Sequence, residues 1–87
     1  MNDGSEPLRW PTNLDHAAIV ARLVQVREAA KASGLGELAA RFASVETMPA
    51  KQIGASVVTA LTWLQGKPEH RAITTQLEMV AMNLKNL

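Results

Sequence analysis

Apolar residues recur along this 87-residue chain at the 3.6-residue period of an α-helix. Three long stretches show the period, at residues 12–33, 47–65 and 66–87, and a short stretch lies at residues 36–44. Their inward faces are formed by Ile19, Leu23, Val26 and Ala30; Leu38 and Phe42; Ile53, Val57, Leu61 and Leu64; and Ile73, Leu77, Val80, Leu84 and Leu87. The pattern predicts an all-α fold, a compact bundle of three long helices and one short connecting helix.

Residues that start and stop helices separate these stretches. We expect the first helix to begin at Thr12 or Asn13, with Thr12 as its N-cap, and to end at Ser33-Gly34. The third helix should follow a cap at Thr47 or Met48, with Pro49 in its first turn. Gly66-Lys67-Pro68 should end it and begin the fourth.

The first eleven residues differ from the rest in composition. Glycine, serine, two prolines and acids predict a flexible N-terminal arm at residues 1–11, followed by a single helical-bundle domain at residues 12–87. Within the arm, we expect Trp10 to fold back against the start of the first helix. The alternative is that Leu8 and Trp10 form a docking segment for a partner.

Between Lys51 and Lys67 the chain carries no charged residue. The apolar run Ile53–Leu64 is twelve residues long, whereas a membrane span needs about twenty. Such a segment is typical of a helix that other protein surrounds. Small residues at positions 55, 59 and 62 lie opposite the large ones and would let another backbone approach closely. We therefore predict that this helix is covered on more than one side.

Three of the predicted helices carry more apolar surface than one packing face needs. The extra positions are Val20, Val24, Trp63, Met79 and Met82. One copy of so short a chain has too few helices to cover them all, and exposed apolar patches usually mark interfaces. We predict that these residues meet a second copy across a twofold axis, so that dimerisation completes the bundle. The alternatives are a different protein partner and a monomer, and Trp63 also fits a core position.

The formal net charge is +1, with acids and bases interleaved. Arg22, Arg27 and Lys31 are the nearest approach to a basic stripe, and Glu28 sits among them. We interpret them as a solvated helix face, which argues against a nucleic-acid partner. The chain has no cysteine, and its N-terminus lacks the basic and apolar parts of a signal peptide. These features predict a cytoplasmic protein without a membrane partner.

The sequence offers few groups for catalysis. Each of its two histidines follows an acid, in Asp15-His16 and Glu69-His70. If the first and last helices ran parallel, these four side chains could gather around a divalent metal, but their spacing matches no common ligand pattern. The serines lie outside a nucleophile-elbow pattern, and Gly34-Leu35-Gly36 lacks the lysine of a phosphate-binding loop. We predict no enzyme activity, no cofactor and no metal site.

One segment resembles part of a DNA-binding motif. Leu38-Ala39-Ala40-Arg41-Phe42 is similar to the first helix of a helix-turn-helix. The next helix offers only Lys51 and Gln52 near its start for the major groove, and residues 44–48 lack the usual glycine turn. A helix-turn-helix-like DNA-binding regulator is therefore the alternative. The main interpretation is a small, non-catalytic, homodimeric protein–protein interaction module.

Overall fold

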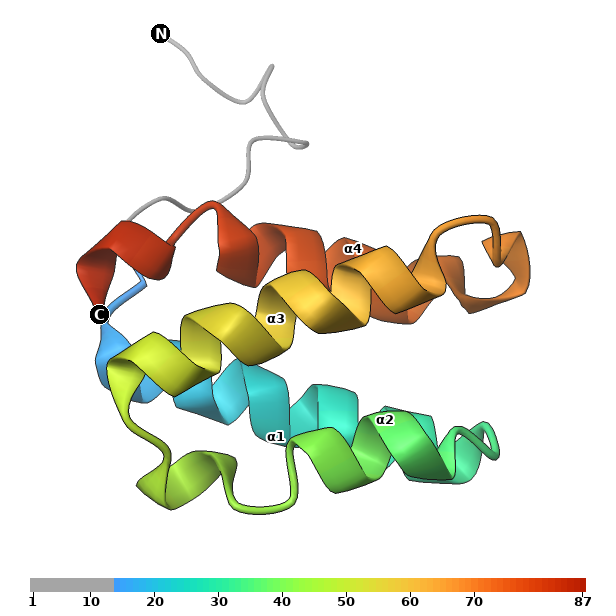
Figure 1. Ribbon diagram of the computed structural model, residues 1–87, viewed down its shortest axis with the longest axis horizontal. Helices are drawn as coiled ribbons and strands as arrows, with labels where there is room; N and C mark the ends of the chain where they lie inside the picture. Colours follow the sequence, from blue (N-terminus) through green and yellow to red (C-terminus); the bar gives the residue numbers. More distant parts are fainter. Residues whose placement is uncertain (1–13) are drawn as a thin grey trace, which may run out of the picture.

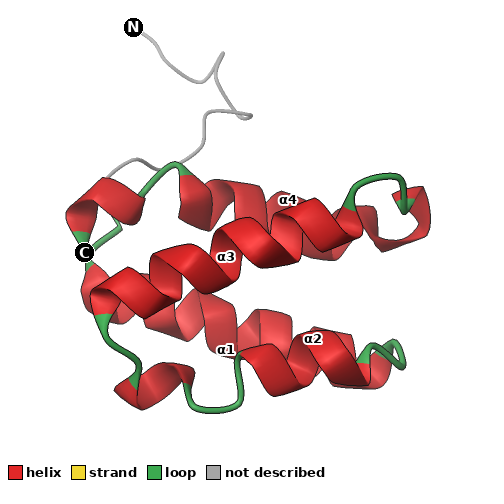
Figure 2. Cartoon of the chain, in the orientation of Figure 1, coloured by secondary structure: helices red, strands yellow, loops and turns green. Residues whose placement is uncertain are grey.

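The computed structural model describes residues 14–87 (Figure 1). These residues form four α-helices and three single-turn 3-10 helices joined by short loops (Figure 2). In chain order they are α1 (His16–Ala32), α2 (Gly36–Arg41), η1 (Val45–Thr47), α3 (Ala50–Leu64), η2 (Pro68–His70), α4 (Arg71–Ala81) and η3 (Leu84–Asn86). The prediction of a compact all-α fold is confirmed for this part of the chain. The predicted arm at residues 1–11 and the cap at Thr12 lie outside the described residues.

The first helix begins later than the sequence analysis predicts. Asp15 is the N-cap of α1: its backbone is extended, and its carboxylate accepts a hydrogen bond of 2.9 Å from the backbone N–H of Ala18. The prediction that the helix includes Leu14 and Asp15 is wrong, because aspartate competes with threonine as a cap. The N–H of Leu14 instead donates to the side chain of Asn83 at 3.1 Å.

Two glycines end helices as predicted. At the end of α1, Gly34 has a φ of +77°, which a side chain rarely tolerates. The N–H of Leu35 donates to the carbonyl of Ala30 at 2.8 Å, and the N–H of Gly34 donates to that of Lys31 at 3.2 Å. These two bonds form a Schellman motif. Gly66, with a φ of +79°, reverses the chain after α3.

The link between α2 and α3 is longer than predicted. α2 ends at Arg41 rather than at residue 44, and η1 forms a separate turn. Pro49 is the N-cap of α3 and lies outside its first turn. Met48 is extended, with a ψ of 135°, because the residue before a proline is driven out of the helical region. Val45 and Met48 are buried, so this link adds to the core.

The helices pack around one core. α1 and α3 run in one direction, and α2 and α4 run in the other (Figure 1). α1 packs against α2 and α4, and α3 packs against α4. The predicted inward residues that are buried are Ile19, Leu23, Val26, Ala30, Leu38, Phe42, Ile53, Val57, Leu64, Ile73, Leu77 and Val80. Leu61, Leu84 and Leu87 are partly buried against this core.

Polar contacts fasten the start of α1 to the end of the chain. Asn83 is fully buried; its Oδ1 accepts from the N–H of Leu14, and its Nδ2 donates to the carbonyl of Met79 at 2.9 Å. The Nδ2 of Asn86 donates to the carbonyl of Leu14, also at 2.9 Å. We call Leu14, Asn83 and Asn86 the terminal latch. It joins the start of α1 to the end of α4, which lie side by side because the two helices pack antiparallel.

Candidate functional site

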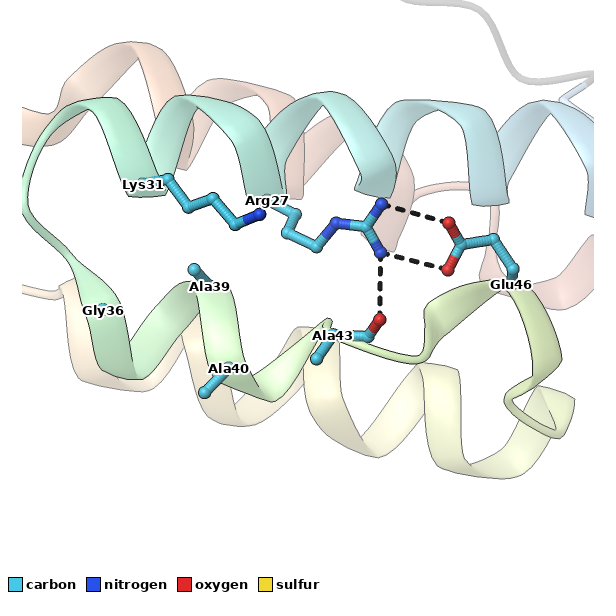
Figure 3. Close-up of a pocket in the computed structure, with 7 residues that line it drawn as sticks. All are labelled: Arg27, Lys31, Gly36, Ala39, Ala40, Ala43 and Glu46. Atoms are coloured by element: carbon cyan, nitrogen blue, oxygen red, sulfur yellow. Dashed lines mark hydrogen bonds and ion pairs between the residues drawn. The ribbon is translucent and has the colours of Figure 1, made fainter.

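A cleft of about 610 Å³ opens between α1 and the α2–η1 segment (Figure 3). Small side chains from α2 form one wall, and charged side chains from α1 and η1 form the others. The lining residues are Arg27, Lys31, Gly36, Ala39, Ala40, Ala43 and Glu46. Arginine, lysine and glutamate together can bind an anion or move a proton, so the hydrogen bonds of these groups decide what the cleft can do.

The guanidinium of Arg27 donates its hydrogen bonds to groups of its own chain. Its Nη1 and Nη2 donate to the two carboxylate oxygens of Glu46, both at 3.0 Å (Figure 3). The Nη1 also donates to the carbonyls of Phe42 at 3.2 Å and Ala43 at 3.1 Å. Only 14% of the Arg27 side chain is exposed. The interpretation of Arg27 as a solvated surface residue is therefore wrong.

The Arg27–Glu46 pair also shifts the titration of both groups. The hydrogen bond from Arg27 lowers the pKa of the Glu46 carboxyl below its ordinary value, and the same contact raises the pKa of Arg27. Both groups stay charged at neutral pH and satisfy each other. Lys31 is the remaining charged residue of the lining. Its side chain is exposed, and its Nζ lies 3.7 Å from the carboxylate of Glu28. We interpret the cleft as a structural junction.

The two acid–histidine pairs lie at opposite ends of the molecule. Asp15 and His16 are at the start of α1, beside the end of α4. Glu69 and His70 are at the start of α4, and the two helices are antiparallel. The parallel arrangement that a shared metal site would need is therefore not formed. Within residues 14–87, no three histidine, aspartate or glutamate side chains gather in a way that could hold a metal ion.

The outer side of α3 is an exposed surface without charge. We define the α3 outer face as Ala55, Val58, Thr59, Thr62 and Trp63, all of which are exposed. Val58 is 57% exposed, more than the other large apolar residues identified as exposed. The rest of the described chain leaves this side of α3 exposed, and the predicted cover over it stays a prediction. The sequence analysis did not single out Val58, although it lies beside Thr62 on the helical wheel.

The five predicted interface residues differ in exposure. Val20 and Val24 are partly buried and pack against the core of their own chain. Met79 is partly buried on α4. Met82 is 48% exposed and Trp63 is 38% exposed. Trp63 is therefore a surface residue and does not occupy a core position.

Trp63 and Met82 do not share a surface. Trp63 lies near the end of α3, beside Glu37, Leu38, Arg41 and Ala60, and the ammonium of Lys67 sits 5.0 Å from its ring centroid. Met82 follows the end of α4 and lies near the start of α3, where a Cβ on Gly54 would be 3.9 Å from Cδ1 of Leu84. The two residues are separated by most of the length of α3. The structure thus divides the predicted interface residues among several surfaces.

The basic residues considered for DNA binding have other partners. Arg27 binds Glu46, and the Nη1 of Arg22 donates to the side chain of Gln76 at 3.1 Å. These contacts leave fewer free cations for phosphates than the sequence suggests. At the start of α3, Lys51 and Gln52 are exposed, as the helix-turn-helix alternative requires.

Two further results bear on the class of protein. Within residues 14–87, none of the helices combines the length and the apolar character that crossing a membrane requires. Comparisons with protein-family models, with curated proteins and with solved structures found no match to this chain.

Proposed function

We propose that this chain is a small, non-catalytic protein–protein interaction module that associates with a second copy of itself through the α3 outer face. The observation that carries the proposal is the exposure of Val58, at 57%, within a helix face that has no charge. Apolar surface exposed to water costs free energy, and association removes it from water. Contiguous exposed patches of this kind usually mark interfaces.

The composition of the face suits a helix partner. Ala55, Thr59 and Thr62 are small and follow the helical spacing of four and three residues, so they allow a second helix to approach closely. Trp63 adds a half-exposed aromatic side chain at the edge, and tryptophan is enriched among residues that carry binding energy. The Thr62 hydroxyl donates to the carbonyl of Val58 in its own helix at 3.0 Å, so burial of Thr62 leaves no unpaired hydroxyl donor.

The test is the solution mass, measured by light scattering on a sizing column over about a hundredfold range of concentration. We expect a dimer that dissociates on dilution. Val58→Asp should shift the protein to the monomer, because it would bury a carboxylate at the interface. Lys31→Glu is the control, since Lys31 is exposed on α1 and is not part of the α3 outer face. A wild-type monomer throughout the range would overturn the proposal, as would a dimer split by Lys31→Glu but not by Val58→Asp.

A further inference from the structure

The α3 outer face alone is too small for a stable dimer. A helix of 15 residues is about 22 Å long and about 10 Å wide, which gives roughly 200 Å² per copy. A stable interface buries about 600 Å² or more on each partner. Two copies that pair through α3 must therefore also cover the surfaces on either side of it, which α2 and α4 provide (Figure 1).

Each flank carries an acid–base pair, and Lys67 adds a second base at the Arg71 end of the α4 side. On the α2 side, Glu37 and Arg41 lie beside Trp63. On the α4 side, Arg71 and Glu78 line a groove of about 400 Å³ beside Leu64, at the end of α3. The four charged side chains of these two pairs are exposed. Within residues 14–87, no oppositely charged group lies within 4.0 Å of any of them.

The charges are in opposite order on the two flanks. α2 and α4 both run antiparallel to α3 (Figure 1), so the first residue of each pair is nearer the end of α3. On α2 that residue is the acid, Glu37, and the base Arg41 lies toward the middle of α3. On α4 it is the base, Arg71, and the acid Glu78 lies toward the middle. Exchange of the two flanks would thus bring acids opposite bases.

A twofold axis parallel to α3 makes that exchange. We propose that two copies of this chain pair with their α3 helices parallel, so that Arg41 of each copy faces Glu78 of the other and Glu37 faces Arg71. This inference rests on the proposed function and adds the orientation and the charges that select the partner. An antiparallel pair would bring the α2 sides of the two copies together, and Arg41 would not meet Glu78.

The test is a charge exchange followed by light scattering. Arg41→Glu alone and Glu78→Arg alone should each weaken the dimer about tenfold or more, because each creates two like-charge contacts per dimer. An equimolar mixture of the R41E and E78R chains should associate again to nearly the wild-type extent, since an acid then opposes a base at both contacts. Lys31→Glu, on α1, is the control and should leave the mass unchanged. Thermal unfolding by circular dichroism checks that each variant folds.

The outcomes separate this inference from the proposed function. A dimer that Val58→Asp dissociates, but whose R41E and E78R chains show no recovery on mixing, would overturn the parallel arrangement and leave association through α3 intact. The parallel arrangement would also be overturned if neither Arg41→Glu nor Glu78→Arg weakened the dimer. A wild-type monomer would overturn both proposals. The parallel pair is supported if the mixture of R41E and E78R chains forms the dimer while each variant alone stays mostly monomeric.

Discussion

Arg27 is the side chain that joins α1 to the segment after α2. It binds a carboxylate and two backbone carbonyls at the end of a helix, where carbonyls lack partners within the helix. Its spacing on the helical wheel could not reveal this role, because the partners Phe42, Ala43 and Glu46 lie 15 to 19 residues away. Only the fold brings them together.

The Arg27–Glu46 pair predicts a pH dependence of stability. The folded state lowers the pKa of Glu46, so the stabilisation is complete above the ordinary pKa of glutamate and is lost as the pH falls through the lowered value. The melting temperature of the wild type should therefore fall on acidification from about pH 5 to about pH 3. Glu46→Gln should melt lower at neutral pH and show a flatter profile over this range.

Glu69→Gln is the control for that measurement. Glu69 is an exposed acid whose carboxylate lies 4.0 Å from Nε2 of His70, and within residues 14–87 it forms no ion pair with an arginine. Its variant should keep the acid slope of the wild type. Equal slopes for the wild type and Glu46→Gln would contradict the assignment of the pH dependence to Glu46.

Asn83 is a fully buried polar residue, and its substitution should lower the stability of the fold. Asn83→Ala removes the acceptor of the Leu14 N–H and the donor to the Met79 carbonyl. Leaving such groups without partners costs about 1–3 kcal/mol, which urea unfolding would measure. Asn86→Ala should cost less, because Asn86 is exposed and water can replace it. The reverse order of the two losses would show that the latch does not depend on Asn83.

At the scale of the element, α3 has a buried face and an exposed face. The sequence analysis treats Leu61 as a buried residue, but it is only partly buried, at the edge of the core. Leu23→Ala should destabilise the fold by about 2–5 kcal/mol, since Leu23 is fully buried in α1. Leu61→Ala should cost clearly less in the same urea unfolding experiment. Equal losses would mean that Leu61 is as well packed as Leu23.

Helix faces could be predicted from the sequence, whereas helix starts could not. The apolar period identifies most of the buried side chains, because a helix in a small bundle can bury only one stripe. The start of α1 differs from the prediction because the sequence offers two good capping residues three positions apart, Thr12 and Asp15; α3 begins after Pro49, which caps it without a side-chain hydrogen bond. Which of Thr12 and Asp15 caps α1 depends on tertiary contacts such as that between Leu14 and Asn83.

At the scale of the whole molecule, association should make stability depend on concentration. If two folded copies bind each other and unfolded chains do not, the melting temperature rises with protein concentration. We expect this rise for the wild type over about a hundredfold range and none for Val58→Asp. Differential scanning calorimetry at several concentrations would measure it. If the melting temperatures of the wild type and Val58→Asp depended on concentration in the same way, association through the α3 outer face would be contradicted.

The candidate surface could be predicted only in part. An uncharged run between Lys51 and Lys67 indicates a covered helix, and the structure shows which side of that helix residues 14–87 leave exposed. The position of Trp63 relative to Met82 depends on the antiparallel packing of α3 and α4, which the apolar period does not encode. The opposite order of the charges on α2 and α4 can be seen only in the fold, because it depends on both helices lying beside α3.

The terminal latch has a consequence for the rates of folding and unfolding. The hydrogen bond from Leu14 to Asn83 joins residues that are 69 positions apart, so it closes almost the whole described chain into one loop. Loop-closure entropy makes such a contact costly to form early, before other contacts shorten the loop. A contact that forms only after the transition state stabilises the native state but not the transition state, so it lowers the unfolding rate. We therefore expect the latch to slow unfolding: Asn83→Ala should shorten the lifetime of the native state in stopped-flow experiments while the refolding rate stays nearly unchanged.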